Sequence, residues 1–303
     1  MKIFRGFAIA GALVAFALAM LGSWTRINNA GMTCPDWPLC QGAIVPALHG
    51  GVVFEWAHRL LAGLETFVVA GLIAIGWRMR ASIPALGPML IALGAVFVLQ
   101  VLIGGATIKF ANSPPSVTIH WGTAMLLLAT LVSLVVVAFA YKPGRIAPAI
   151  ARRGVGPLFI ATAWLWVTMC LGAFVSSSGA GLACPSVPGC STTFLAQTGP
   201  QTLQMIHRFF AAGVFVLGAT GLMLLPATRR RAAATTRIAV ILSAIQIALG
   251  VLNVLHEMPM ALREAHAATA MATFLTFVVA TAFTSLEAAG EPDFAAAPAS
   301  ASA

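Results

Sequence analysis

Two pairs of histidines are the residues of this chain best suited to binding a metal. They are His58, His120, His207 and His266. His58-Arg59 recurs as His207-Arg208 at a spacing of 149 residues, and His120 recurs as His266 at a spacing of 146. A lone histidine near the end of a membrane helix is usually an interfacial residue that hydrogen-bonds to a neighbour. Here two pairs lie at matching positions, one in each half of the chain, and this repetition favours metal ligation instead.

The chemistry of the pairs favours a haem over zinc. Two imidazoles on facing helices of a bundle are typical axial ligands of haem iron, whereas zinc needs three or four ligands, commonly with thiolates or carboxylates. Arg59 and Arg208 each follow a histidine and could pair with haem propionates. Snorkelling to lipid headgroups explains these arginines equally well. His49 and His256 lie in connections without a counterpart, so we interpret both as loop histidines.

A carboxylate distinguishes the first histidine pair from the second. Glu55 precedes His58 by three residues and shares its helix face, whereas Gln204 occupies the matching position before His207. A carboxylate beside a haem pocket can activate water or stabilise developing positive charge. The first half is therefore the better candidate for chemistry, and the second for a permanently bound cofactor. The structural alternative is that Glu55 caps its helix or pairs with Arg59.

A second carboxylate, Glu65, lies two turns farther along the same apolar segment, where the repeat has Val214. Carboxylates within the membrane are functional candidates by default. Three roles stay open for Glu65: a protonated acid, a proton carrier, or a hydrogen-bond partner of the haem edge.

Four of the five cysteines form a repeated Cys-Pro-x-x-Pro-x-Cys motif. They are Cys34, Cys40, Cys184 and Cys190. Paired cysteines on the oxidising side of a bacterial membrane indicate disulfides, and structural disulfides are the simplest interpretation. A redox role stays open for the first pair because it lies in the half expected to be reactive. Cys170 has no partner in the pattern and is interpreted as a core residue.

The elements that position these residues are membrane helices. The chain has 303 residues, of which 60% are hydrophobic and only 8% charged, so its solvent is lipid. A spanning helix needs about 20 mostly apolar residues, and continuously apolar segments favour helices over a barrel. Eight segments qualify: 4–24, 56–77, 85–106, 119–140, 155–175, 204–225, 235–255 and 265–286. The first could instead be a signal peptide, but it has a counterpart in the repeat.

The repeat predicts an all-α integral membrane protein made of two tandem, pseudo-symmetric four-helix bundles. Besides the cysteines and histidines, Gln100 recurs as Gln246. An even number of helices gives both halves the same orientation in the membrane. We expect bundles over 1–141 and 155–287, a cytoplasmic linker over 142–154 and a disordered tail over 288–303.

The charge distribution predicts the topology. The formal net charge is +9, and 12 of the 17 basic residues fall on one side of the predicted membrane. The positive-inside rule then places both termini in the cytoplasm, and the cysteine loops and histidine ends of the helices on the outer side. Because position explains the charge, we expect no nucleic-acid partner.

Taken together, these motifs resemble the haem A synthase family, membrane enzymes that convert haem o to haem a. The resemblance extends to about Leu286 and depends on TRINNAG followed by PDWPLC, Glu55-Trp56-Ala57-His58-Arg59, Gln100-Val101-Leu102-Ile103-Gly104-Gly105, His120, His207-Arg208 and His266. It implies oxidation of the C8 methyl group of haem o to a formyl group by two successive hydroxylations and loss of water.

The resemblance also implies a role for each site residue. The second-half pair, His207 and His266, would hold a haem b cofactor, and the first-half pair, His58 and His120, would serve the substrate haem o. Glu55 would be important for catalysis. Haem o synthase is a partner suggested by the resemblance alone, and the electron acceptor is unidentified.

Two other functions use the same pattern. A di-haem, b-type electron-transfer protein would need the four histidines, but not a carboxylate in one half only. A haem or solute transporter would share the parallel repeat, but its helices should be broken near the midplane, whereas the prolines here cluster mostly in loops and at helix ends. We therefore expect an oxidoreductase in a bacterial plasma membrane.

Overall fold

The structure, a computed structural model, describes residues 1–141, 155–190 and 194–288. The described chain is helical and contains eight long helices. These are α1 (Lys2–Ile27), α2 (Val52–Met79), α3 (Leu86–Lys109), α4 (Pro114–Ala140), α5 (Val155–Ser177), α6 (Gly199–Met223), α7 (Arg230–Leu255) and α8 (Met260–Ala288), with a short 3₁₀ helix η1 (Ala180–Leu182) after α5.

All eight long helices can cross a membrane. Their apolar spans are 22 to 28 residues long, and a bilayer core needs about 20. Hydrophobic side chains such as Leu13, Phe67 and Phe209 are exposed on their outer surfaces, where lipid is the natural solvent. The prediction of an all-α, eight-helix integral membrane protein is confirmed.

The even-numbered helices begin earlier than the apolar segments predicted. α4 begins at Pro114 and α6 at Gly199, about five residues before their apolar segments. Proline in the first turn of both helices and the Thr198 side chain at the start of α6 favour these earlier starts. The histidines therefore lie about two turns inside their helices rather than at the helix starts.

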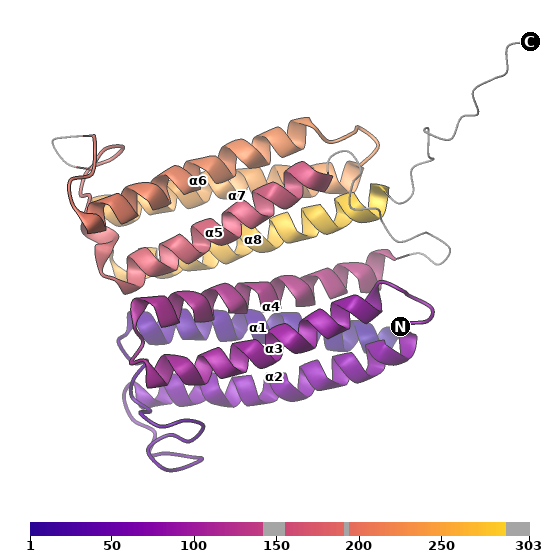
Figure 1. Ribbon diagram of the computed structural model, residues 1–303, viewed down its shortest axis with the longest axis horizontal. Coiled ribbons are helices and arrows are strands. Elements are labelled where there is room, and N and C mark those ends of the chain that lie inside the picture. Colours follow the sequence, from indigo (N-terminus) through magenta and orange to yellow (C-terminus); the bar gives the residue numbers. More distant parts are fainter. Residues whose placement is uncertain (142–154, 191–193, 289–303) are drawn as a thin grey trace, which may run out of the picture.

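The helices gather in two groups, α1–α4 and α5–α8 (Figure 1). Within the first group, α1 packs against α2 and α4, and α3 packs against the same two helices; α5 and α7 do the same with α6 and α8. His58 on α2 and His120 on α4 thus lie on helices that face each other across a group. The chain begins at the end of the molecule opposite the loop between α1 and α2 (Figure 1).

The two groups pack against each other mainly through α4, which contacts α5 and α8. The indole Nε1 of Trp166 on α5 donates a hydrogen bond to the carbonyl of Gly122 on α4, at 2.9 Å. Cys170 is a free, partly buried cysteine whose sulfur lies against Gly122 at this contact. The expected linker over 142–154 and most of the expected tail lie outside the described residues, and the domain boundaries stay predictions.

Candidate functional site

The four histidines lie in the N-terminal halves of the even-numbered helices. His58 and His120 belong to the first group of helices, and His207 and His266 to the second. The two histidines of each pair lie on facing helices of one group, and all four are partly buried. The chain thus brings the histidines together in the predicted pairs, while their binding of haem stays a prediction.

Each histidine ring packs against a glycine on the preceding helix, a feature that the sequence analysis missed. A β-carbon added to the glycine would fall within 3.2 Å of the ring Cε1 in every case, where ordinary carbon contacts are about 3.5–4.0 Å. The pairs and distances are Gly22–His58 at 3.1 Å, Gly104–His120 at 3.2 Å, Gly172–His207 at 2.9 Å and Gly250–His266 at 3.2 Å.

These glycines follow the internal repeat. Gly22 and Gly172 lie 150 residues apart, as the cysteine motifs do, and Gly104 and Gly250 lie 146 residues apart, as His120 and His266 do. The repeat could therefore have singled them out among the 28 glycines of the chain. It could not have shown that their missing side chains make room for the rings.

The repeated glutamines contact the histidines of α4 and α8. The side-chain amide of Gln100 lies 3.3 Å from Nδ1 of His120. Gln246 instead donates to the backbone carbonyl of His266, at 3.0 Å. Within the described chain, the buried Nδ1 atoms of His58, His207 and His266 have no fully formed hydrogen bond, although the backbones of Leu18 and Thr168 lie close to the His58 and His207 rings, respectively.

The donor set fits haem better than a metal ion alone. In residues 1–141, 155–190 and 194–288, no three side chains of the types His, Cys, Asp and Glu come together as a metal site would require. Each half instead offers two imidazoles on facing helices of one group. This is the arrangement that axial ligation of haem iron uses.

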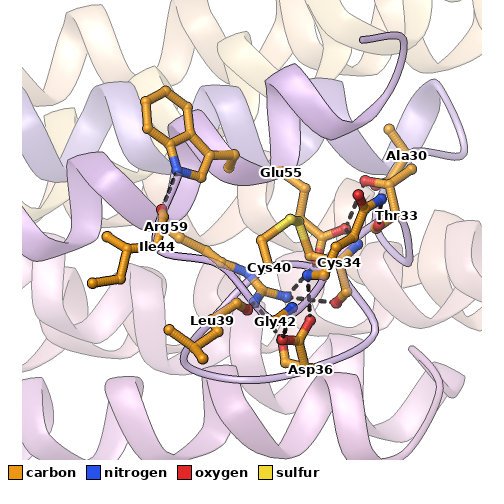
Figure 2. Close-up of a disulfide and its surroundings, with 12 residues drawn as sticks. Ala30, Thr33, Cys34, Asp36, Leu39, Cys40, Gly42, Ile44, Glu55 and Arg59 are labelled. Carbon is orange, nitrogen blue, oxygen red and sulfur yellow. Dashed lines mark hydrogen bonds and ion pairs between the residues drawn. A yellow bond between two sulfur atoms is a disulfide. The ribbon is translucent and has the colours of Figure 1, made fainter. Parts of the chain in front are cut away.

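Glu55 connects the first turn of α2 to the Cys34–Cys40 loop, as Figure 2 shows. Its side chain is buried, and its Oε2 accepts hydrogen bonds from the Thr33 hydroxyl and the Cys34 N–H, both at 2.9 Å. Its Oε1 pairs with the Arg59 guanidinium at 2.7 Å. The structure therefore gives Glu55 the pairing with Arg59 foreseen as the structural alternative, and its catalytic role stays a prediction.

Gln204 makes the equivalent connection in the second half. Its Oε1 accepts from the Cys184 N–H at 2.6 Å, and its Nε2 donates to the Gly181 carbonyl at 2.7 Å. An amide thus holds the second loop by neutral hydrogen bonds alone. In the first half, Glu55 adds a negative charge, and this charge is not needed to hold the loop.

Both arginines bind carbonyl groups of the adjacent cysteine loop. Arg59 donates to the carbonyls of Cys34, Asp36 and Leu39 (Figure 2). Arg208 donates to the carbonyls of Cys184, Ser186 and Gly189, which are the equivalent positions. Of these two arginines, only Arg59 has a carboxylate partner among the described residues. Contact of either arginine with a haem propionate stays a prediction, and the propionate would share the guanidinium with these carbonyls.

The four paired cysteines form two disulfides, Cys34–Cys40 and Cys184–Cys190, as predicted. Both loops also contain a cis peptide bond before their second proline, at Trp37–Pro38 and Val187–Pro188. In the first loop, the N–H groups of Gly42 and Gln41 donate to Asp36 and hold the pKa of its carboxyl group below the usual range.

We expect Cys184→Ser mainly to lower stability. A disulfide that closes so short a loop contributes at most a few kcal/mol, largely by restricting the unfolded chain. Arg208 and Gln204 would still hold the loop, so the helices should remain assembled. Thermal unfolding of the purified variant in detergent should show a lower Tm, and its haem content should be close to that of the wild type. If thiol reagents labelled all four cysteines of the native protein from outside, the disulfide assignment would be wrong.

Glu65 is buried in the first group of helices, with only 1% of its surface exposed. Neither carboxyl oxygen has a hydrogen-bond partner in the described chain. A β-carbon added to Gly11 would lie 3.6 Å from its Oε1, so the carboxyl group lies between α1 and α2. At the equivalent positions the second half has Ala161 and Val214, both buried. Its three candidate roles stay open.

Comparison with known proteins identifies the family. Residues 5–278, which include both histidine pairs and both cysteine loops, match the COX15-CtaA family model, described as cytochrome oxidase assembly protein. The chain belongs to this family.

Curated relatives named heme A synthase are similar over most of their length. The protein of Bacillus licheniformis is 26% identical over 223 residues, which cover 71% of this chain and 72% of the relative. That of Halalkalibacterium halodurans is 28% identical over 220 residues, or 70% of this chain and 73% of the relative. That of Geobacillus kaustophilus is 28% identical over 217 residues, or 70% and 68%.

Proposed function

We propose that this membrane protein is a haem A synthase, an oxidoreductase that converts the C8 methyl group of haem o to a formyl group. One observation carries the proposal beyond family membership. The chain has two facing histidine pairs in equivalent places, and three residues before the first histidine the first half has a carboxylate, Glu55, where the second half has the neutral Gln204. A protein that only transferred electrons between two haems would have no need of this difference.

The two halves have different roles in this proposal. His207 and His266 would hold a haem b cofactor as axial ligands, and His58 and His120 would hold the substrate haem o. When bound, haem b supplies one-electron redox chemistry. In the second half, the neutral Gln204 holds the loop at the position that Glu55 occupies in the first half.

The reaction requires water to be activated and electrons to be removed. Each hydroxylation replaces a C–H bond by a C–O bond derived from water and releases two electrons and two protons to an unidentified acceptor. The second hydroxylation gives a geminal diol, which loses water to give the formyl group. Glu55 would stabilise positive charge that develops on the substrate and would orient the attacking water. Its bonds to Thr33 and Cys34 fix the direction of its carboxylate.

The same proposal places both termini in the cytoplasm and the cysteine loops outside, in a bacterial plasma membrane. Lys2 and Arg5 lie in the first turn of α1, Arg229 precedes α7, and Arg230 and Arg231 begin it, all at the basic end. Haem o would enter from the bilayer, and haem o synthase is the candidate supplier. An electron acceptor on either side of the membrane completes the reaction.

Product analysis tests the proposal. The protein is expressed in cells that lack their own haem A synthase, with and without a haem o synthase, and the pigments are extracted and identified by mass. We expect haem a only when haem o is supplied, together with about one tightly bound haem b per chain. Two equivalent haem b groups and no haem a would favour the di-haem electron-transfer protein.

A further inference from the structure

The four glycines that face the histidine rings are the strongest unassigned feature of the site. In every contact the nearest ring atom is Cε1, and at Gly172 the Nδ1 and Nε2 atoms of His207 are equally distant, at 3.5 Å. A β-carbon at Gly22 would lie 3.1 Å from Cε1, 3.5 Å from Nδ1 and 3.9 Å from Nε2 of His58. At Gly104 and Gly250, Cε1 and Nδ1 are again the nearest ring atoms. In these three contacts Nε2 is therefore the ring nitrogen farther from the neighbouring helix.

This packing limits how each ring can turn. An imidazole ligand must direct one nitrogen lone pair at the iron, which fixes both side-chain torsions of the histidine. A ring whose Cε1 atom lies against a helix backbone cannot turn farther toward that helix. The histidine backbones are fixed in turn by their own helices, so the glycine contact removes the remaining freedom of the ring.

We infer that Gly22, Gly104, Gly172 and Gly250 are positioning residues that orient the four axial histidines so that Nε2 faces the haem iron. The inference rests on the proposed haem binding. It adds that each odd-numbered helix, which carries no axial histidine, determines the orientation of the histidine ring on the helix that follows it. Any β-carbon at these positions would push the imidazole away from the neighbouring helix and out of line with the iron.

The contact between Gly172 and His207 gives the sharpest test because it is the shortest, at 2.9 Å. Gly172→Ala should not weaken α5, since alanine favours a helix more than glycine does. The substitution should instead displace the His207 ring, which is the proposed haem ligand. Changes to groups that orient a metal-bound histidine typically cost 10- to 100-fold in metal affinity, so we expect haem b to be lost to apomyoglobin about 10-fold faster or more.

Gly156→Ala is the matched control, because Gly156 lies on the same helix and an added β-carbon meets nothing within 4 Å. Both variants are purified with their haem, and the rate of haem loss and the low-spin electron paramagnetic resonance spectrum are measured. We expect a changed spectrum and faster loss for Gly172→Ala, and wild-type behaviour for Gly156→Ala. A purely structural role for Gly172 would leave the spectrum unchanged.

Two further variants separate the possible failures. If Gly172→Ala does not fold, Gly250→Ala repeats the test at the milder distance of 3.2 Å from His266. A wild-type spectrum and wild-type haem loss in the folded glycine variants would overturn the inference. His207→Ala tests the haem assignment itself, since unchanged haem b in that variant would contradict the proposed function rather than the role of the glycine alone.

Discussion

Replacing Glu55 by glutamine should lower formation of the formyl product by about 10²-fold or more, the usual scale for a lost acid–base group. The change removes a negative charge and keeps the size of the side chain. Gln204 already shows that an amide can hold a cysteine loop, by accepting from Cys184 and donating to Gly181. A glutamine at position 55 can accept from Cys34 in the same way, so the fold and both haem sites should persist.

The measurement is the ratio of haem o, the alcohol intermediate and haem a, separated by chromatography and identified by mass. Expression with a supply of haem o should leave haem o bound or only partly oxidised. Gln204→Glu is the matched control, because it adds a carboxylate beside the other histidine pair and should leave haem a formation largely intact. If a folded Glu55→Gln protein formed nearly as much haem a as the wild type, Glu55 would have only a structural role, holding the loop and pairing with Arg59. Glu65 would then be the next candidate for the catalytic carboxylate.

Replacing His207 or His266 by alanine should abolish tightly bound haem b. Each substitution removes one of the two axial ligands that the proposal assigns to haem b. His58→Ala should leave haem b largely in place, because His58 lies in the other group of helices. It should instead stop haem a formation.

The haem content of the three purified variants gives the result directly, as the absorbance of the extracted pyridine complex per mole of protein. Gly63→Ala, an exposed position on the same helix as His58 where an added β-carbon meets nothing within 4 Å, controls for the effect of substitution in α2. Equal loss of haem b from all three histidine variants would show that the halves do not have separate roles.

Much of the fold was predictable because lipid imposes simple rules on sequence. Eight apolar segments predicted eight helices, and the repeat predicted which histidines would lie together. The starts of α4 and α6 were less predictable, because Pro114 and Thr198 extend the helices past the apolar segments. A hydropathy pattern detects the part of a helix in lipid and misses the turns beyond it.

The site was predictable in its residues and less so in its contacts. The spacing of Glu55 and Arg59 allowed their ion pair, which is local to one helix. The bond from Glu55 to Cys34 crosses 21 residues and depends on the folded shape of the loop. The contact of Gly22 with His58 depends on the register of two helices. Such contacts follow from tertiary packing, which one sequence without relatives does not reveal.

The contact between Arg26 and Ser176 concerns the ancestry of the chain. These residues occupy equivalent positions, 150 apart, and the arginine Nη2 donates to the serine hydroxyl at 2.7 Å. Equivalent residues of two identical subunits meet each other only near the two-fold axis of a dimer. A symmetric dimer of the first unit would bring two guanidinium groups together there and repel itself. When both units belong to one polypeptide, the residues at equivalent positions can become different. Arg26 and Ser176 differ in this way, and so do Glu55 and Gln204.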